Sequence, residues 1–451
     1  MESPEGKTSE TSGSESVSTR LKRIAELARK APGMALTTLA HHIDIDLLHV
    51  AYGLTRKDGA VGVDRQTAES YEKNLEGNLQ SLLERFKSGT YVAPPVRRVY
   101  IPKSDGKSRR PIGVPTFEDK VLQRAVSMVL EAVYEQDFRD CSYGFRPGRS
   151  AHQALDVLWH GLMKMGGGVV LELDIQKFFD NLSHCHLRSF LDQRIRDGVL
   201  RRMIDKWLAA GVLEDGCVHY PQSGSPQGGV VSPILSNIYL HEVLDRWFED
   251  VVKPRLRGQA FLVRFADDAV IVFTHEEDAR RVMEVLPKRF GKYGLTLHPE
   301  KTRLVSFRRP PKGGERNPQT GTFDFLGFTH YWGKSWKGGW VLKRQTARSR
   351  LTRALKTLSV WMRRNFHRSI DDQRVDLVRK VQGHYAYYGI TGNARALKDF
   401  LCAVGRLWRT WLGRRSDRAR MSWLAFNEFL RRHPLPRVRI VHSALLSVAR
   451  P

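Results

Sequence analysis

The stretch from residue 260 to residue 273, AFLVRFADDAVIVF, limits most strongly how this chain can fold. Two apolar runs are separated by Ala266 and two adjacent carboxylates, Asp267 and Asp268. The runs have the composition of buried β-strands, and Asp is common where two strands reverse direction. The sequence therefore predicts a strand, a turn and a strand. It leaves open whether the carboxylates only form the turn or also bind metal ions.

A second apolar run also ends in a carboxylate. The segment GGGVVLELDIQKFFDN (166–181) is typical of a buried strand with Asp174 at its end. If this strand and the two strands around Asp267 share one sheet, Asp174 and Asp267 meet at the same place. Nucleotidyl transfer uses two divalent cations roughly 3.5–4 Å apart, which prefer carboxylate oxygens. The pattern predicts a metal site at these residues, with a plain turn as the alternative.

Positive charge is concentrated in the last quarter of the chain. Residues 341–451 hold 25 Lys and Arg against 6 Asp and Glu, a net charge of +19 out of the +26 of all 451 residues. Such charge repels itself in a compact domain unless a polyanion neutralises it. Seven tryptophans between Trp332 and Trp423 interleave with the basic residues, which favours nucleic acid over an anionic membrane surface. A merely soluble basic surface is the alternative.

Other bulk features narrow the class of protein. The four cysteines are scattered without a CxxC pair, so the sequence predicts neither a disulfide framework nor a zinc ribbon. The first residues are polar, which predicts a disordered tail over residues 1–35 and no signal peptide. No apolar run reaches membrane-spanning length. We therefore expect a protein of the reducing cytoplasm with no membrane partner.

The rest of the pattern alternates helices and strands, which is typical of an α+β fold. Residues 91–115 indicate a hairpin with basic strands, and residues 116–136 indicate a helix. Beyond residue 345 the pattern becomes helical. The apolar residues predicted to share one face of the first helix there are Leu351, Ala354, Leu355, Leu358 and Trp361.

Several motifs together resemble those of the group II intron reverse transcriptases. They follow that family's order and spacing: GAVGVDRQT, RRVYIPKSDGKSRRPIGVPTFEDKVLQRAV, SYGFRPGRSAHQAL, VLELDIQKFFDNL, PQGGVVSPILSNIYL, RFADDAVIVF, LHPEKT and FDFLGF. The similarity covers about residues 55–330. A further segment, VQGHYAYYGI (381–390), is similar to the signature of the family's thumb, or maturase, domain.

The resemblance implies a right-hand polymerase fold with fingers, palm and a C-terminal α-helical thumb. The domains it implies are the disordered tail 1–35, a helical N-terminal extension 36–95, fingers 96–170, a palm with the metal site 171–340, and a basic helical thumb or maturase domain 341–451. No paired cysteines follow Cys402. We therefore expect the bacterial type that lacks an HNH endonuclease domain.

The resemblance also implies roles for individual residues. Asp174 and Asp267 look like the principal ligands of two Mg²⁺ ions, for which Mn²⁺ can substitute, with Asp268 as a second carboxylate and the Ile175 carbonyl as a further ligand. The residues that look like nucleotide contacts are Lys103 with Arg109 or Arg110 for the triphosphate, Phe179 as a steric gate against the ribose 2′-hydroxyl, Gln227 in the pocket, and Lys301 near the departing pyrophosphate. Core packing is the alternative for Phe179, and a solvated surface lysine is the alternative for Lys301.

The function implied is that of an RNA-directed DNA polymerase that also assists splicing and mobility of its intron. Its expected partners are group II intron RNA, an RNA template with a DNA or RNA primer, and dNTPs, within a bacterial cytoplasmic ribonucleoprotein. Two alternatives stay open: a non-catalytic RNA-splicing cofactor, and a domesticated reverse transcriptase used in host defence or repair. The three carboxylates favour the enzyme, because a protein that only binds RNA has no chemical need of them. Oligomeric state does not follow from the sequence.

Overall fold

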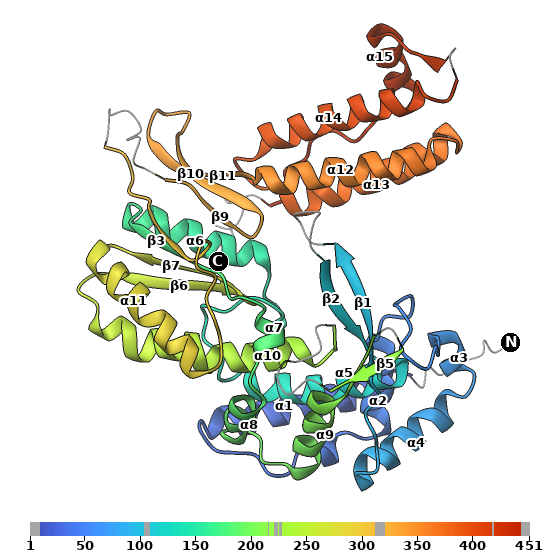
Figure 1. Cartoon of the computed structure of the whole chain (residues 1–451), viewed down its shortest axis with the longest axis vertical. Coiled ribbons are helices and arrows are strands. Elements are labelled where there is room, and N and C mark those ends of the chain that lie inside the picture. The colour runs from blue at the N-terminus through green and yellow to red at the C-terminus, as the bar shows by residue number, and fades with distance from the viewer. Residues whose placement is uncertain are drawn as a thin grey trace, which may run out of the picture. The chain divides into compact units, whose positions relative to one another are not determined.

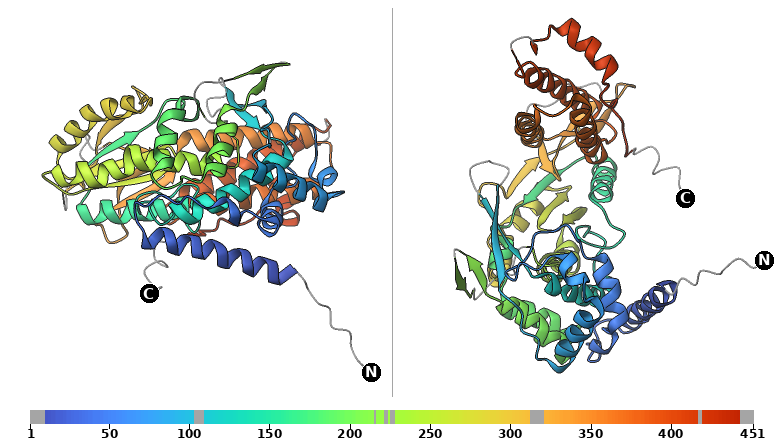
Figure 2. Two further views of the ribbon diagram at one scale, coloured as in Figure 1. Left: turned by 90° about the horizontal axis from the view of Figure 1, so that it is seen from below. Right: turned by 90° about the vertical axis from the view of Figure 1, so that its right-hand side faces the viewer.

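The computed structural model describes residues 10–102, 109–214, 216–220, 224, 228–311, 321–416 and 419–442, with side chains from residue 17 onwards. The chain forms two compact units, residues 1–154 with 171–303, and residues 155–170 with 304–451. Both contain helices and strands, so the predicted α+β class is confirmed (Figures 1 and 2). No helix in these described ranges is long and apolar enough to cross a membrane.

The first unit is built around helix α5 (Phe117–Tyr134), which the sequence predicted at residues 116–136. Its N-cap, Thr116, accepts a hydrogen bond from the Asp119 amide, and most of its residues are buried. The other helices of this unit are α1 (Glu10–Lys30), η1 (Ala40–His42), α2 (Ile45–Leu54), α3 (Ala68–Glu72), α4 (Leu75–Ser88), α7 (Phe178–Asn181), α8 (His184–Asp192), α9 (Gly198–Ala209), α10 (Ser232–Leu240) and α11 (Glu276–Lys292). Helix α10 continues through the wider π-helical turns η2 (His241–Asp245) and η3 (Trp247–Val252) and the short η4 (Lys253–Arg255).

Two sheets belong wholly or mainly to this unit. The first has the order β2-β1-β4-β5, with β1 (Val96–Pro102) antiparallel to β2 (Arg109–Val114) and parallel to β4 (Val212–Glu214), and with β5 (Cys217–His219) at the edge. The basic hairpin predicted within residues 91–115 is thus confirmed, with its strands at Val96–Pro102 and Arg109–Val114. The second sheet has the order β6-β7-β3-β8, formed by β6 (Ala260–Phe265), β7 (Asp268–Phe273), β3 (Val169–Leu173) and β8 (Arg303–Ser306). The chain passes between the units within β3, β8 and helix α6 (Ala151–Met165).

The expectation of a disordered tail over residues 1–35 is wrong for residues 10–30. These residues form α1, which packs against α5 and α2 (Figures 1 and 2). Val17, Ile24 and Ala28 are buried on one face of α1. Arg20 forms an ion pair with Asp44 at the start of α2. The helix is missed from the sequence because its few apolar residues are diluted by polar ones.

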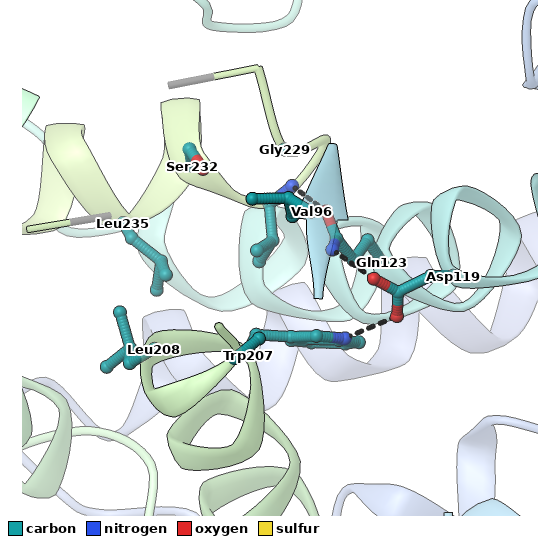
Figure 3. A pocket seen from close by; sticks show the side chains of 10 residues that line it. Val96, Asp119, Gln123, Trp207, Leu208, Gly229, Ser232 and Leu235 are labelled. Atoms are coloured by element: carbon teal, nitrogen blue, oxygen red, sulfur yellow. Dashed lines mark hydrogen bonds between the residues drawn. The ribbon is translucent and has the colours of Figure 1, made fainter. Parts of the chain in front are cut away.

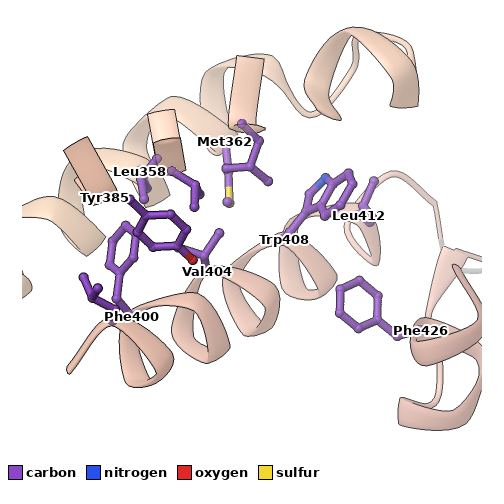
Figure 4. Packing of buried hydrophobic residues seen from close by; sticks show 11 residues of the cluster. Leu358, Met362, Tyr385, Phe400, Val404, Trp408, Leu412 and Phe426 are labelled. Atoms are coloured by element: carbon purple, nitrogen blue, oxygen red, sulfur yellow. The ribbon is translucent and has the colours of Figure 1, made fainter. Parts of the chain in front are cut away.

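In its described residues, the second unit combines a small sheet, most of α6 and four further helices. The sheet has the order β11-β10-β9, from β9 (Phe323–Phe325), β10 (Phe328–Lys334) and β11 (Trp340–Thr346). The further helices are α12 (Arg348–Asn365), α13 (Ile370–Tyr388), α14 (Ala394–Leu412) and α15 (Trp423–Arg432). Their core contains Leu358, Met362, Tyr385, Phe400, Val404, Trp408, Leu412 and Phe426 (Figure 4). The apolar face predicted for residues 351–361 lines this core.

The division between the units falls at residues 303/304, whereas the sequence analysis placed the start of the thumb at residue 341. Hydrogen bonds explain the difference. The Asn393 side chain accepts from the Thr346 amide at 2.9 Å, and the Tyr387 hydroxyl donates to the Leu326 carbonyl at 2.8 Å. The strands before residue 341 are thereby tied to the helices that follow them. Residues 155–170, predicted as fingers, join this unit because Trp159 donates to the Leu342 carbonyl.

Candidate active site

The two adjacent carboxylates lie at the hairpin that joins β6 to β7. The strands pair antiparallel with Phe265 opposite Asp268, so Ala266 and Asp267 form the turn. Ala266 has a φ of 55°, in the left-handed region that two-residue hairpins use. Asp267 is half-buried and Asp268 is exposed. The predicted strand, turn and strand are therefore confirmed.

A buried salt bridge holds the backbone of this turn. Arg264 donates to both carboxylate oxygens of Asp245 at 2.7 and 2.6 Å, and both side chains are fully buried. Its third nitrogen donates to the Ala266 carbonyl and to the Asn237 side-chain oxygen, each at 3.0 Å. Burial alone would lower the pKa of Arg264, but Asp245 outweighs burial and raises it. The guanidinium therefore stays charged and fixes the carbonyl of the turn.

Backbone also packs directly against the turn. Residues 141–143 pair with the outer edge of β6 through backbone hydrogen bonds to Arg264. The Gly144 carbonyl accepts a hydrogen bond from the Asn237 side chain at 2.7 Å. A Cβ on Gly144 would lie 2.9 Å from the carbonyl carbon of Phe265, and closer still to the turn amide. Only glycine allows this approach.

Asp174 directly follows β3, as predicted. Its carbonyl accepts from the His298 amide at 2.8 Å, and Ile175 forms an isolated bridge with Leu297. This pairing fixes the backbone on both sides of the carboxylate. The Lys301 ammonium lies 2.7 Å from Asp174 Oδ2, although its side chain is 64% exposed. Lys301 is therefore not simply a solvated surface lysine, because it meets a candidate metal ligand.

Asp174 and Asp267 lie close enough for their charges to interact. Burial is the main cause that raises the pKa of Asp267, and the negative charge of Asp174 raises it further. Arg110, on β2, is the hairpin arginine whose charge opposes this shift. Arg109 and Arg110 are both exposed. The electrostatics therefore favour Arg110 over Arg109 as the arginine that faces the carboxylates.

This donor set fits a divalent cation. Ionised carboxylates that face each other repel, and a hard cation between them relieves the repulsion. In the part of the chain that the structure describes, no three His, Cys, Asp or Glu side chains already stand together as a metal cluster. Lys301 supplies the positive charge at Asp174 instead. A bound cation at Asp174 would therefore take the place of that ammonium.

Helix α7 carries the aromatic residue predicted to act as a steric gate. Phe178 is 3% exposed and packs in the core, whereas Phe179 is only half-buried, with 5.3 Å between the two ring centroids. Gly224 approaches this helix so closely that a Cβ on it would lie 2.9 Å from the Phe179 carbonyl oxygen. His184 Nε2 lies 2.6 Å from the Gly224 carbonyl oxygen. Phe179 is thus not a residue of the deep core, and one end of the following loop is fixed beside it.

The other end of that loop is fixed against the basic hairpin. Gly228 has a φ of 122°, and a Cβ on it would lie 2.5 Å from the Gly113 carbonyl oxygen of β2. Gln227, which precedes Gly228, lies outside the described residues, and so does Lys103. Gly224 and Gly228, the described residues on either side of Gln227, approach α7 and β2 respectively.

Sequence reasoning missed the residues that support the turn. Arg264 lies in a run of apolar residues, and a charge inside a buried strand is a signal that it has a buried partner. Asn237 lies in the largely apolar helix α10, and Asp245 lies in its continuation η2. Their polarity marks them as unusual, but only the fold reveals that they converge on Arg264.

Comparison with known proteins identifies a family for most of this region of the chain. The family model described as reverse transcriptase (RNA-dependent DNA polymerase) matches residues 101–330. Group II intron-encoded protein LtrA of Lactococcus lactis subsp. cremoris is 35% identical over 284 residues, which cover 60% of this chain and 46% of the relative. The chain thus spans less than half the length of that relative.

Two further relatives extend the comparison. Protein YkfC of Escherichia coli (strain K12) is 35% identical over 279 residues, covering 54% of this chain and 71% of the relative. Nuclear intron maturase 4, mitochondrial, of Arabidopsis thaliana is 26% identical over 190 residues, covering 42% of this chain and 23% of the relative.

Proposed function

The chain belongs to the reverse transcriptases, the RNA-dependent DNA polymerases, and on that premise we propose that it copies RNA into complementary DNA by two-metal nucleotidyl transfer. We propose further that it binds group II intron RNA and assists splicing and mobility in a ribonucleoprotein. The observation that carries the proposal is the electrostatic interaction of Asp174 with Asp267, two carboxylates that lie 93 residues apart in the sequence. A turn without a further role would not need a second carboxylate beside it.

The metal ligands are Asp174, Asp267 and Asp268, with the Ile175 carbonyl. When bound, two Mg²⁺ ions activate the attacking 3′-hydroxyl and neutralise the leaving pyrophosphate. The protein's own contribution is to fix the carboxylates before substrate arrives. Arg264 fixes the Ala266 carbonyl, and the His298 amide fixes the Asp174 carbonyl. This preorganisation matters because a small displacement of reacting groups costs much of the rate.

The incoming dNTP contacts residues from four segments. Arg110, with Lys103 and Arg109, holds the triphosphate through charge-assisted hydrogen bonds. Phe179 excludes a ribose 2′-hydroxyl sterically, and Gln227 lines the pocket. Lys301 holds Asp174 in the absence of substrate and lies near the departing pyrophosphate during reaction. The half-buried position of Phe179 beside Gly224 supports the assignment of the gate.

The basic helices of the second unit bind the RNA template and the intron. Helix α12 buries its apolar face in the core and exposes its basic residues, which are Arg348, Arg350, Arg353, Lys356, Arg363 and Arg364. A row of exposed guanidinium and ammonium groups binds the phosphate backbone without reading sequence. We therefore propose that the helices from residue 341 onwards act as the thumb, with β9 to β11 and residues 155–170 in the same unit, and that the first unit holds the fingers and the palm.

Two alternatives make different predictions. A non-catalytic splicing cofactor would keep RNA binding without needing the carboxylates, and an enzyme of host defence or repair would polymerise without an intron partner. The decisive experiment replaces Asp267 and Asp268 with Asn, which keeps size and turn propensity but removes two charges. The purified variant is assayed for Mg²⁺-dependent primer extension on RNA and for RNA binding at matched salt.

We expect primer extension to fall by several orders of magnitude while RNA affinity holds or rises slightly. The matched control is Asp371→Asn with Asp372→Asn, another adjacent pair, which is exposed at the start of α13 and removes the same charge. This control should keep full extension activity. Near-normal extension by the Asp267/Asp268 variant would refute the metal site. Intron RNA affinity of the parent no better than for unrelated RNA would refute the splicing role.

A further inference from the structure

Helix α5 carries a row of three polar residues on a buried face. Asp119, Gln123 and Ser127 follow one another at intervals of four residues, so they share one side of the helix. Each is between 1% and 3% exposed. Buried polar residues at such spacing are unusual in a helix whose other inward residues are apolar. We call these three residues the α5 polar row.

The polar row holds the turn that leads into α10. Gln123 Oε1 accepts hydrogen bonds from the Val230 and Val231 amides at 2.7 and 3.3 Å, and the Ser127 hydroxyl donates to the Val230 carbonyl at 3.5 Å. Val231 is the N-cap of α10 and has no side chain that can cap the helix. Gln123 of α5 therefore satisfies the amide of the N-cap residue, one of those that a helix leaves free at its N-terminus, and the amide before it.

Asp119 sets the orientation of the Gln123 amide (Figure 3). Its carboxylate accepts hydrogen bonds from Trp207 Nε1 at 2.6 Å, from the Tyr91 hydroxyl at 3.2 Å and from Gln123 Nε2 at 3.0 Å. Because the NH₂ group of Gln123 donates to Asp119, its oxygen must face the two valine amides. Gln123 Oε1 can therefore accept from the valine amides only while Asp119 accepts from Gln123 Nε2.

Among the residues that the structure describes, no Lys, Arg or His forms an ion pair with the Asp119 carboxylate. Burial raises its pKa to about 6, while its three hydrogen-bond donors oppose that shift and Glu118 adds to it. Glu118 is itself paired with Arg85 of α4 at 2.6 Å. From α9, Lys206 donates to the Tyr91 carbonyl at 2.7 Å. The residues of the turn and of α10 that line this site, Gly229, Val231, Ser232 and Leu235, bring no charge.

The held turn lies next to the proposed nucleotide pocket. It runs from Gly228, which packs against Gly113 of β2, to Val231, and Gln227 precedes it in the chain. We propose that Asp119, Gln123 and Ser127 are positioning residues that fix the Gly228–Val231 turn and thereby the affinity for the incoming dNTP. The effect on dNTP affinity rests on the proposed function. The effect on the turn does not.

Protonation of Asp119 removes one acceptor from this arrangement. Trp207 can only donate, so the remaining acceptor serves Trp207, and the Gln123 amide turns round to accept from the acid. Its NH₂ group then faces the Val230 and Val231 amides, which are also donors. The turn loses its cap, and we expect weaker dNTP binding as the pH falls through about 6.

The test compares four variants with the parent in primer extension. Asp119→Asn mimics the protonated acid, Gln123→Met removes the cap at constant size, and Trp207→Phe removes one donor to Asp119. The matched control is Asp278→Asn, another buried carboxylate that accepts two backbone amides, from Arg257 and Gly258, but does not touch the turn. KM for dNTP, kcat and the Kd for template–primer are measured from about pH 5 to pH 8.

We expect Asp119→Asn to raise KM about tenfold at neutral pH, with kcat and template–primer Kd unchanged. The ratio of its KM to that of the parent should fall towards one at low pH, since the parent is then protonated too. Titration of the nucleotide phosphate cancels in this ratio. Gln123→Met should raise KM at every pH. Trp207→Phe should weaken the dependence of KM on pH, because the protonated acid can then place its proton on Oδ1 and still accept from Gln123 on Oδ2. A ratio that does not change with pH, or a fall in kcat at constant KM, would overturn the proposal.

A second measurement does not depend on activity. Hydrogen exchange of peptides covering residues 228–240 is followed in the full-length protein for the same variants at matched pH. Faster exchange there in Asp119→Asn and Gln123→Met, but not in Asp278→Asn, is the expected result. Equal exchange would refute the positioning role even in an active enzyme. If the parent does not extend a primer at all, the proposed function fails while this measurement still decides about the turn.

Discussion

Replacing Asp245 with Asn should destabilise the protein strongly, because it leaves the Arg264 guanidinium buried without its counter-charge. Both side chains are fully buried, and the two nitrogen–oxygen distances are 2.7 and 2.6 Å. Removing one partner of such a pair costs about 3–5 kcal/mol. That is a large part of the ~5–15 kcal/mol that stabilises a typical folded domain.

The expected loss of free energy of unfolding corresponds to a measurable shift in urea denaturation. For a denaturant slope of about 2–3 kcal/mol per molar urea, the loss lowers the unfolding midpoint by roughly 1–2.5 M. Circular dichroism during urea titration measures it. The matched control is Glu277→Gln, which breaks an Arg–carboxylate pair of 2.5 Å whose side chains are 70% and 72% exposed. An exposed pair contributes about 0–1 kcal/mol, so the control should barely move the midpoint.

A double variant separates stability from positioning. Asp245→Leu combined with Arg264→Met removes both charges and replaces them with apolar groups of similar size, which often restores stability. It does not restore the hydrogen bond that Arg264 donates to the Ala266 carbonyl. We expect a stable protein with poor primer extension. Loss of less than about 1 kcal/mol in Asp245→Asn, or full activity in the double variant, would refute this reasoning.

Three further predictions follow from the site and the helices. Phe179→Val should admit ribonucleotides in primer extension, because the side chain that meets the 2′-hydroxyl becomes smaller; unchanged discrimination between dNTP and rNTP would reject the gate. Gly144→Ala should reduce primer extension about 100-fold at unchanged RNA affinity, since its Cβ would displace the Asp267 turn, whereas Gly53→Ala, with no atom within 4 Å, should be neutral. Arg353→Gln with Lys356→Gln should lower the slope of log affinity for RNA against log salt by about 1–2, and Arg280→Gln on α11 should leave that slope as it is.

The elements that could be predicted from the sequence are those specified by residues close together in the chain. The α5 helix, the basic hairpin and the hairpin at Asp267 are each specified by neighbouring residues, such as the Thr116 cap and the alternation of apolar and basic residues. The end of β3 at Asp174 follows in the same way. These elements carry most of the candidate metal site, and so the ligands could be proposed before the fold was known.

Long-range pairing explains what the sequence could not predict. Lys301 meets Asp174 from 127 residues away, and Asn393 joins Thr346 from 47 residues away. No periodicity encodes such distances. The α5 polar row left a readable signal, a spacing of four, but its partners at Val230 and Val231 are more than 100 residues further along the chain.

The buried Asp119 of α5 also lowers the free energy of unfolding. The pKa of Asp119 rises from 3.8 to about 6 in the folded state, so folding stability falls as the pH rises across that interval. The loss is complete near neutral pH and amounts to about 3 kcal/mol. The ionised form that lowers folding stability near neutral pH is also the form that lets Gln123 hold the Val230 and Val231 amides. Heat resistance and the use of scarce nucleotide therefore place opposite demands on this one side chain.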